Sequence, residues 1–117
     1  MDTLFAIAEP NRRKIIQLLA QRGNLTAGEI AGHFRSSAPA ISQHLQVLRE
    51  AKTVTVERQA QKRIYSLNPK TLRDLAGWLF DLTTQWEQRL DNLESLLREE
   101  KRNSPDSHKS QSKKGKR

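Results

Sequence analysis

Residues 37–51 are SAPAISQHLQVLREA, a stretch that predicts an amphipathic helix. Ser37 can cap this helix, and Pro39 then stands in its first turn, where a missing amide donor costs nothing. Three apolar side chains share one face at the spacing i, i+4 and i+7: Ile41, Leu45 and Leu48. The opposite face carries short or amide-bearing side chains and one carboxylate: Pro39, Ser42, Gln43, Gln46 and Glu50. The helix therefore has one face suited to a core and one suited to polar contacts.

A shorter helix is predicted directly upstream. Thr26 followed by Glu29 is a capping-box signature. The apolar side chains that follow share one face: Ile30, Ala31 and Phe34. Only residues 35–38 separate this helix from the next, so the pair follows the helix-turn-helix plan. Further upstream, the helical spacing of apolar residues predicts a helix over Asn11 to Gln21 and a short one from Leu4 to Ala8.

A β-hairpin is predicted directly after the helix-turn-helix. Val54 and Val56 alternate with polar residues, and a second strand-like run follows a short polar segment. The apolar residues of that second run are Ile64, Tyr65 and Leu67. The tip, residues 59–61, contains no glycine, so we expect a longer and looser loop than a tight type I′ turn. A hairpin in this place makes the helix-turn-helix a winged helix.

One long helix is predicted from Thr71 to about Lys101, because this stretch contains no proline and only one glycine. Leucine or tryptophan recurs along it every seven residues, at positions 72, 79, 86 and 93. The apolar stripe is wider than a chain of this size can cover, so a second copy is expected to bury it. The residues predicted at this dimer interface are Leu4, Phe5, Leu79, Leu82, Trp86, Leu90 and Leu93. The predicted fold class is mainly α with a small β-hairpin, a dimeric winged helix-turn-helix of order α-α-α-α-β-β-α.

The polar face of the 37–51 helix and the hairpin tip are candidate contacts with double-stranded DNA. A Gln amide can pair bidentately with adenine, and a hydroxyl can meet a base edge or a phosphate. We predict that Gln43 reads bases, while Ser42 and His44 position the DNA backbone. The full predicted set is Ser37, Pro39, Ala40, Ser42, Gln43, His44, Gln46, Arg58, Lys62 and Arg63. The alternatives are an ordinary solvated helix face and an edge strand protected by its charges.

Charge is unevenly distributed along the 117 residues. Lys and Arg number 21 against 13 Asp and Glu, a net charge of +8, so an anionic partner is expected. Residues 101–117 hold seven of these bases and one of the acids, and residues 102–117 contain no Ala, Val, Ile, Leu, Met, Phe, Tyr or Trp. We therefore expect a DNA-binding and dimerisation domain over residues 1–101 and a disordered basic tail over residues 102–117.

The sequence offers no set of residues for catalysis or for binding a metal or cofactor. Cysteine is absent, which removes thiolate metal sites and thiol catalysis. His33, His44 and His108 are not spaced as a ligand pair. We therefore predict that the protein is not an enzyme and has neither a metal nor a cofactor. No apolar run approaches the roughly 20 residues of a membrane span, and no secretion signal is visible, so we expect no membrane insertion and a cytoplasmic location.

Four stretches resemble the ArsR family of bacterial winged-helix repressors: residues 8–16 (AEPNRRKII), 26–31 (TAGEIA), 37–51 and 63–69 (RIYSLNP). The resemblance covers about Leu4 to Leu82. It implies a homodimer built from the first and last helices, two recognition helices in successive major grooves, and repression released by a signal that weakens DNA binding. The ligands of metal-sensing members are missing, so the chain is more similar to the cysteine-free branch of autorepressors. Lys52 stands where the family often has glycine, so a lysine at positive φ is expected.

The leading interpretation is a homodimeric repressor that binds an inverted-repeat operator and responds to an unidentified protein or small-molecule inducer. The first alternative is a metal- or ligand-gated sensor of the same fold. The second is a coiled-coil protein-interaction module with nonspecific nucleic-acid affinity. Such a module would have no need of the amide and hydroxyl face between Ser37 and Leu48.

Overall fold

The computed structural model describes residues 2–103 of the chain. The chain divides into two units, Met1–Gly77 and Trp78–Arg117. The predicted basic tail lies outside the described residues, apart from residues 102 and 103, which continue the last helix. Within the described residues, no helix is both long enough and apolar enough to span a membrane.

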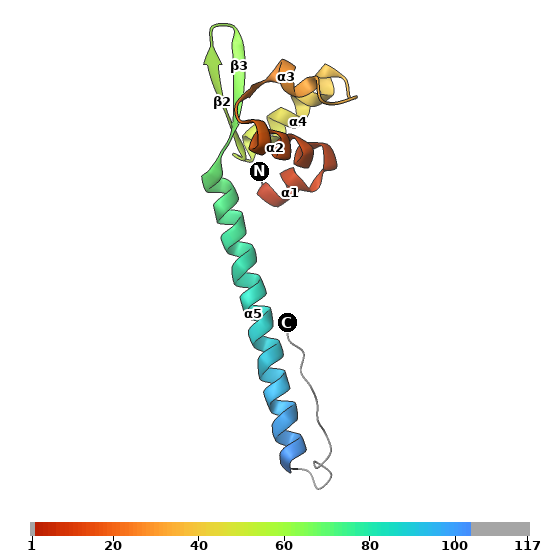
Figure 1. The fold of residues 1–117 in the computed structure, drawn as a ribbon, viewed down its shortest axis with the longest axis vertical. Coiled ribbons are helices and arrows are strands. Elements are labelled where there is room, and N and C mark those ends of the chain that lie inside the picture. The colour runs from red at the N-terminus through yellow and green to blue at the C-terminus, as the bar shows by residue number, and fades with distance from the viewer. Residues whose placement is uncertain (1, 104–117) are drawn as a thin grey trace. The chain divides into compact units, whose positions relative to one another are not determined.

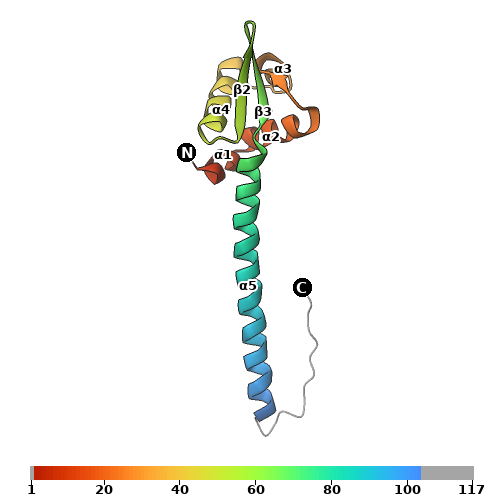
Figure 2. The ribbon, with the colours of Figure 1, turned by 90° about the vertical axis from the view of Figure 1, so that its left-hand side faces the viewer.

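The elements follow the predicted order, with one addition. The helices are α1 (Thr3–Ala8), α2 (Pro10–Arg22), α3 (Ala27–Ala31), α4 (Ala38–Glu50) and α5 (Pro69–Asn103). The strands are β1 (Leu25–Thr26), β2 (Val54–Gln59) and β3 (Lys62–Leu67). In the first unit, the tip of the β2–β3 hairpin projects beyond helices α2, α3 and α4 (Figure 1 and Figure 2). The prediction of a mainly helical winged helix-turn-helix is confirmed.

Side-chain caps fix where the helices of the helix-turn-helix begin. The Ser37 hydroxyl accepts a hydrogen bond from the amide of Ala40 at 3.3 Å, which starts α4. The capping box ahead of α3 is complete, because the Thr26 hydroxyl accepts from the Glu29 amide at 3.1 Å and the Glu29 carboxylate accepts from the Thr26 amide at 2.9 Å. Both starts are where the sequence placed them.

The core of the first unit is built from one face of each helix and from the hairpin. Ile41, Leu45 and Leu48 of α4 are at most 1% exposed, as their spacing predicted. The other buried apolar residues come from α1 to α3 and from the segment after α4: Ala6, Ile15, Leu19, Ile30, Ala51, Val54 and Tyr65. Because α4 is anchored along this face, its opposite face is held toward solvent in a fixed orientation.

Strand β1 is an element that the sequence analysis missed. Leu25 pairs with Tyr65 and Thr26 pairs with Ile64, which gives an antiparallel sheet of order β1-β3-β2. Two residues are too few to show the alternation that marks a strand. The pairing joins the start of the helix-turn-helix directly to the inner strand of the hairpin.

The hairpin tip corrects a prediction. Gln59 pairs with Lys62, so only Ala60 and Gln61 lie between the paired strands, and the loop is tight rather than long. Among the described non-glycine residues only Lys52 and Ala60 have positive φ, and that of Ala60 is 55°. A type I′ turn requires positive φ at both central residues, so this turn is of another type. The expectation that the turn is not of type I′ is confirmed, and the expected length is wrong. The loop is short because Ala60 takes a conformation that glycine usually supplies, at a cost of about 1–2 kcal/mol.

The end of α4 confirms the expectation for Lys52. Its φ is 62°, and its amide donates to the Arg49 carbonyl at 2.9 Å. The Thr53 amide and hydroxyl both donate to the Leu48 carbonyl, at 3.0 and 2.9 Å. This pattern is a Schellman motif with lysine at the position that favours glycine.

Candidate nucleic-acid interface

The outer face of α4 presents the residues that the sequence singled out. Five of them are exposed: Ser37, Pro39, Ser42, Gln43 and Gln46. Ala40 is half-buried in the first turn. The hydroxyl of Ser37 is engaged as the helix cap, and the Gln46 amide donates to Glu50 at 3.4 Å. Within residues 2–103, no group hydrogen-bonds the side-chain amide of Gln43, which is therefore available to a ligand.

His44 faces α2 rather than open solvent. Its side chain is 18% exposed, and its Nδ1 lies 3.2 Å from Arg12 Nη1 and 3.9 Å from Glu9 Oε1. A guanidinium only donates, so the shorter contact makes Nδ1 an acceptor and places the ring proton on Nε2. His44 thus packs at the border of the face, and Nε2–H is the group with which it would meet a phosphate oxygen.

The hairpin brings three cations to its tip. Arg58, Lys62 and Arg63 are all exposed. Arg58 and Arg63 are directly opposite each other in the β2–β3 register, and Gln59 and Lys62 form the next pair. Like charges facing each other across strands are destabilising. The repulsion between Arg58 and Arg63 therefore destabilises the hairpin when no ligand is bound, and a bound anion would reduce it.

Arg12 and Arg13 are residues whose contacts the sequence analysis did not foresee. Arg12 is 9% exposed, and its Nε donates to the Ala6 carbonyl at 2.6 Å. Arg13 Nη1 donates to the carbonyls of Ile7 and Ala8, at 3.2 and 2.7 Å. The sequence did contain a signal for these contacts. Helix α1 has no basic residue in its own last turn to interact with its terminal carbonyls, and two adjacent arginines follow the break at Glu9 and Pro10.

The predicted interface residues are exposed in the single chain. Leu4 and Phe5 lie on α1 and are 39% and 56% exposed. The others lie on α5 with exposures from 38% to 60%: Leu79, Leu82, Trp86, Leu90 and Leu93. Exposed large apolar side chains in such number are typical of a protein-protein contact surface.

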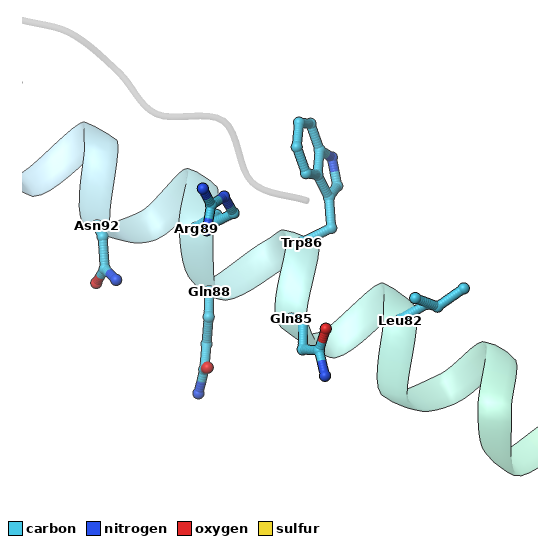
Figure 3. Close-up of a pocket in the computed structure, with 6 residues that line it drawn as sticks. All are labelled: Leu82, Gln85, Trp86, Gln88, Arg89 and Asn92. Carbon is cyan, nitrogen blue, oxygen red and sulfur yellow. The ribbon is translucent and has the colours of Figure 1, made fainter.

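Two of the pockets in the described part of the chain bear on the proposed surfaces. The larger, about 570 Å³, is lined only by α5: Leu82, Gln85, Trp86, Gln88, Arg89 and Asn92. Leu82, Trp86 and Arg89 point to one side of the helix, while Gln85, Gln88 and Asn92 point to another (Figure 3). The smaller pocket, about 420 Å³, lies between α2 and α4 and is lined by Arg12, Gln43, His44, Gln46, Val47 and Glu50. The smaller one thus borders the polar face of α4.

The described residues contain no group of three or more His, Cys, Asp or Glu placed to hold a metal ion. His33 is exposed and lies two residues beyond the end of α3, well apart in sequence from His44. His108, the third histidine, lies outside the described residues.

Comparison with known proteins settles the family. The model for "Bacterial regulatory protein, arsR family" matches residues 9–55. The transcriptional repressor SdpR of Bacillus subtilis (strain 168) is 41% identical over 91 residues, which make up 77% of this chain and 100% of that protein. The chain belongs to the arsR family. The arsR-family resemblance drawn from the sequence is thereby confirmed.

Two further proteins described as transcriptional regulators agree with this assignment. The HTH-type transcriptional regulator Rv2034 of Mycobacterium tuberculosis (strain ATCC 25618 / H37Rv) is 37% identical over 92 residues, covering 79% of this chain and 82% of that protein. A crystal structure of a possible transcriptional regulator for arsenical resistance matches with a TM-score of 0.65 and 43% identity, covering 81% of this chain and 95% of that one. This arsR-family chain is a DNA-binding transcriptional regulator with a winged helix-turn-helix.

Proposed function

We propose that the chain is a homodimeric repressor that binds an inverted-repeat operator in double-stranded DNA. Each protomer inserts the polar face of α4 into a major groove and lays the β2–β3 hairpin against phosphates. Two-fold symmetry then presents the two recognition helices roughly 34 Å apart, one turn of DNA. The similarity to SdpR, which is named as a repressor, favours repression over activation.

The observation that carries the proposal is the polar face of α4. Gln43 is exposed, and within residues 2–103 its amide is unpaired, so it can read a base edge without breaking an internal bond. Ser42 beside it is exposed, and His44 can donate from Nε2; we assign both to phosphates. Ser37, Pro39, Ala40 and Gln46 complete the contact surface.

The hairpin supplies affinity that does not depend on sequence. Arg58, Lys62 and Arg63 bring positive charge to a tip that projects beyond the helices of the first unit (Figure 1). The facing pair of Arg58 and Arg63 is costly without an anion and favourable with one.

A second copy of the chain is the proposed cover for the exposed apolar residues. Helix α5 has 35 residues, or about 52 Å at 1.5 Å per residue. Leu79, Trp86 and Leu93 stand seven residues apart on it, which is the spacing of helix-helix packing. The residues proposed for the interface are this stripe, with Leu82 and Leu90, together with Leu4 and Phe5 of α1.

Residues 1–101 form the proposed DNA-binding and dimerisation domain, and residues 102–117 form the proposed basic tail. The protein acts in the cytoplasm, where operator DNA lies, and performs no catalysis. Repression ends when an inducer, either a protein or a small molecule, weakens DNA binding.

The proposal is tested by selecting bound duplexes from a random pool and determining the mass of the complex. We expect an enriched inverted repeat whose half-site centres are about 10 base pairs apart, bound by two chains. Enrichment of a single unrepeated site bound by one chain would contradict the homodimer. Binding without any enrichment would contradict the operator.

A metal-gated sensor is the second candidate, because one structural relative is described as a possible regulator for arsenical resistance. The absence of cysteine removes thiolate ligands for arsenic or zinc. We expect operator affinity, measured by fluorescence anisotropy, to be the same with chelator, with added zinc and with arsenite. A large metal-dependent change accompanied by stoichiometric metal would favour the sensor.

A further inference from the structure

Arg12 of α2 joins three elements of the first unit. Its Nε donates to the Ala6 carbonyl of α1 at 2.6 Å, and its Nη1 lies 3.2 Å from His44 Nδ1 of α4. Its guanidinium carbon lies 5.4 Å from the centroid of the Phe5 ring of α1. One buried side chain therefore touches both α1 and α4, the proposed recognition helix.

The chemistry of arginine suits this position. The guanidinium is planar, and its donors point in fixed directions, so two partners bound at once are held at a defined separation. Lysine carries a single point charge on a flexible stem and cannot span both. A movement of α4 away from α1 would leave a nearly buried charge without one of its partners, which is costly.

Arg12 contacts both a residue of the proposed dimer interface and the helix that carries the proposed DNA-binding face. Phe5, which packs beneath the guanidinium, is 56% exposed and belongs to the proposed dimer interface. His44 lies on α4 beside Gln43, the proposed base-reading residue. Arg12 thus connects a residue of the proposed interface to the helix of the proposed DNA face, alongside the direct packing of α1 against α4.

We propose that Arg12 is a positioning residue that fixes α4 relative to α1 and so sets the separation of the two recognition helices in the dimer. This inference rests on the proposed homodimer. A loss of positioning affects a full operator, which needs both helices at the correct spacing, and spares a half-site, which one helix can occupy alone.

Binding to full-operator and half-site duplexes, measured by fluorescence anisotropy, separates positioning from direct contact. For Arg12→Gln we expect full-operator affinity to fall about tenfold, the value of one to two lost hydrogen bonds, with half-site affinity within about twofold of wild type. The matched control is Arg13→Gln, because the Arg13 side chain donates to the Ile7 and Ala8 carbonyls at the end of α1 rather than to α4. It should leave both affinities within about twofold.

A distance measurement reads positioning without DNA. The chain has no cysteine, so Arg49→Cys, at an exposed position of α4, supplies one spin-label site in each protomer. Pulsed electron paramagnetic resonance should give a narrow distance distribution between the two labels with Arg12 and a broader one with Arg12→Gln. If Arg12→Gln does not fold, Arg12→Lys, which keeps the charge and the alkyl stem, is measured with the same expected pattern.

Each outcome has a defined meaning. Arg12→Gln could lower half-site affinity by some factor and full-operator affinity by the square of that factor. That result would show that Arg12 contacts DNA, and it would overturn the proposal. Unchanged affinities or an unchanged distance distribution would also overturn it. Wild-type protein that binds the full operator no more tightly than the half-site would instead refute the homodimer, before any Arg12 variant is considered.

Discussion

At the scale of single residues, the side-chain amide of Gln43 carries the prediction of sequence reading. Gln43→Ala should cost roughly 1–3 kcal/mol on the selected operator and little on random DNA, because a base contact is lost while phosphate contacts remain. Gln17→Ala, at an exposed glutamine of α2, is the control and should change neither. Equal losses on both DNAs, measured by anisotropy titration, would make Gln43 a backbone contact.

Lys52 carries a prediction about stability. Its φ of 62° is unfavourable for any residue with a Cβ, so Lys52→Gly should raise the free energy of unfolding by about 1 kcal/mol. Urea denaturation followed by circular dichroism measures the change. Lys52→Ala removes the side chain but keeps the strained backbone, and it should leave stability within about 0.5 kcal/mol of wild type. If alanine stabilises as much as glycine does, backbone strain is not the cause.

At the scale of elements, the hairpin should account for part of the salt dependence of binding. Neutralising Arg58, Lys62 or Arg63 to glutamine one at a time should lower the slope of log affinity against log salt by about one unit for each side chain that contacts a phosphate. Lys70→Gln is the control, because Lys70 is paired with Asp74 at 3.0 Å on α5. Slopes that stay unchanged in all three variants would place the hairpin off the DNA.

Elements whose determinants lie close together in sequence could be predicted, and those that depend on distant partners could not. The caps at Ser37 and Thr26 and the buried face of α4 follow from spacings of a few residues. Strand β1 exists only because β3, almost 40 residues later, provides its partner. The contacts of Arg12 were equally hidden, since one partner is a backbone carbonyl and the other is 32 residues away.

At the scale of the whole molecule, the apolar stripe of α5 carries the prediction of a homodimer. Replacing Leu79 and Leu82 together by glutamate should give monomers with greatly weakened operator affinity, because charges at the interface cannot be buried. Sedimentation equilibrium measures the change in mass. The control pair is Thr84→Glu with Gln88→Glu, on the side of the helix away from the stripe.

That control should sediment and bind as the wild-type protein does. Wild-type chains that sediment as monomers at micromolar concentration, and still bind the operator tightly, would refute the interface. A charged substitution at Phe5 tests the part of the interface assigned to α1. If the variant assembles to the same mass as the wild-type protein, Leu4 and Phe5 do not belong to the interface.

Thr26 belongs at once to strand β1, where it pairs with Ile64, and to the capping box that begins α3. Opening the strand pair therefore disturbs the first turn of the helix, and fraying that turn disturbs the strand pair. The helix-turn-helix and the β2–β3 hairpin should consequently open together as one cooperative unit. In native-state hydrogen exchange, the amides of α3 and β3 should become exposed with the same free energy and the same dependence on denaturant.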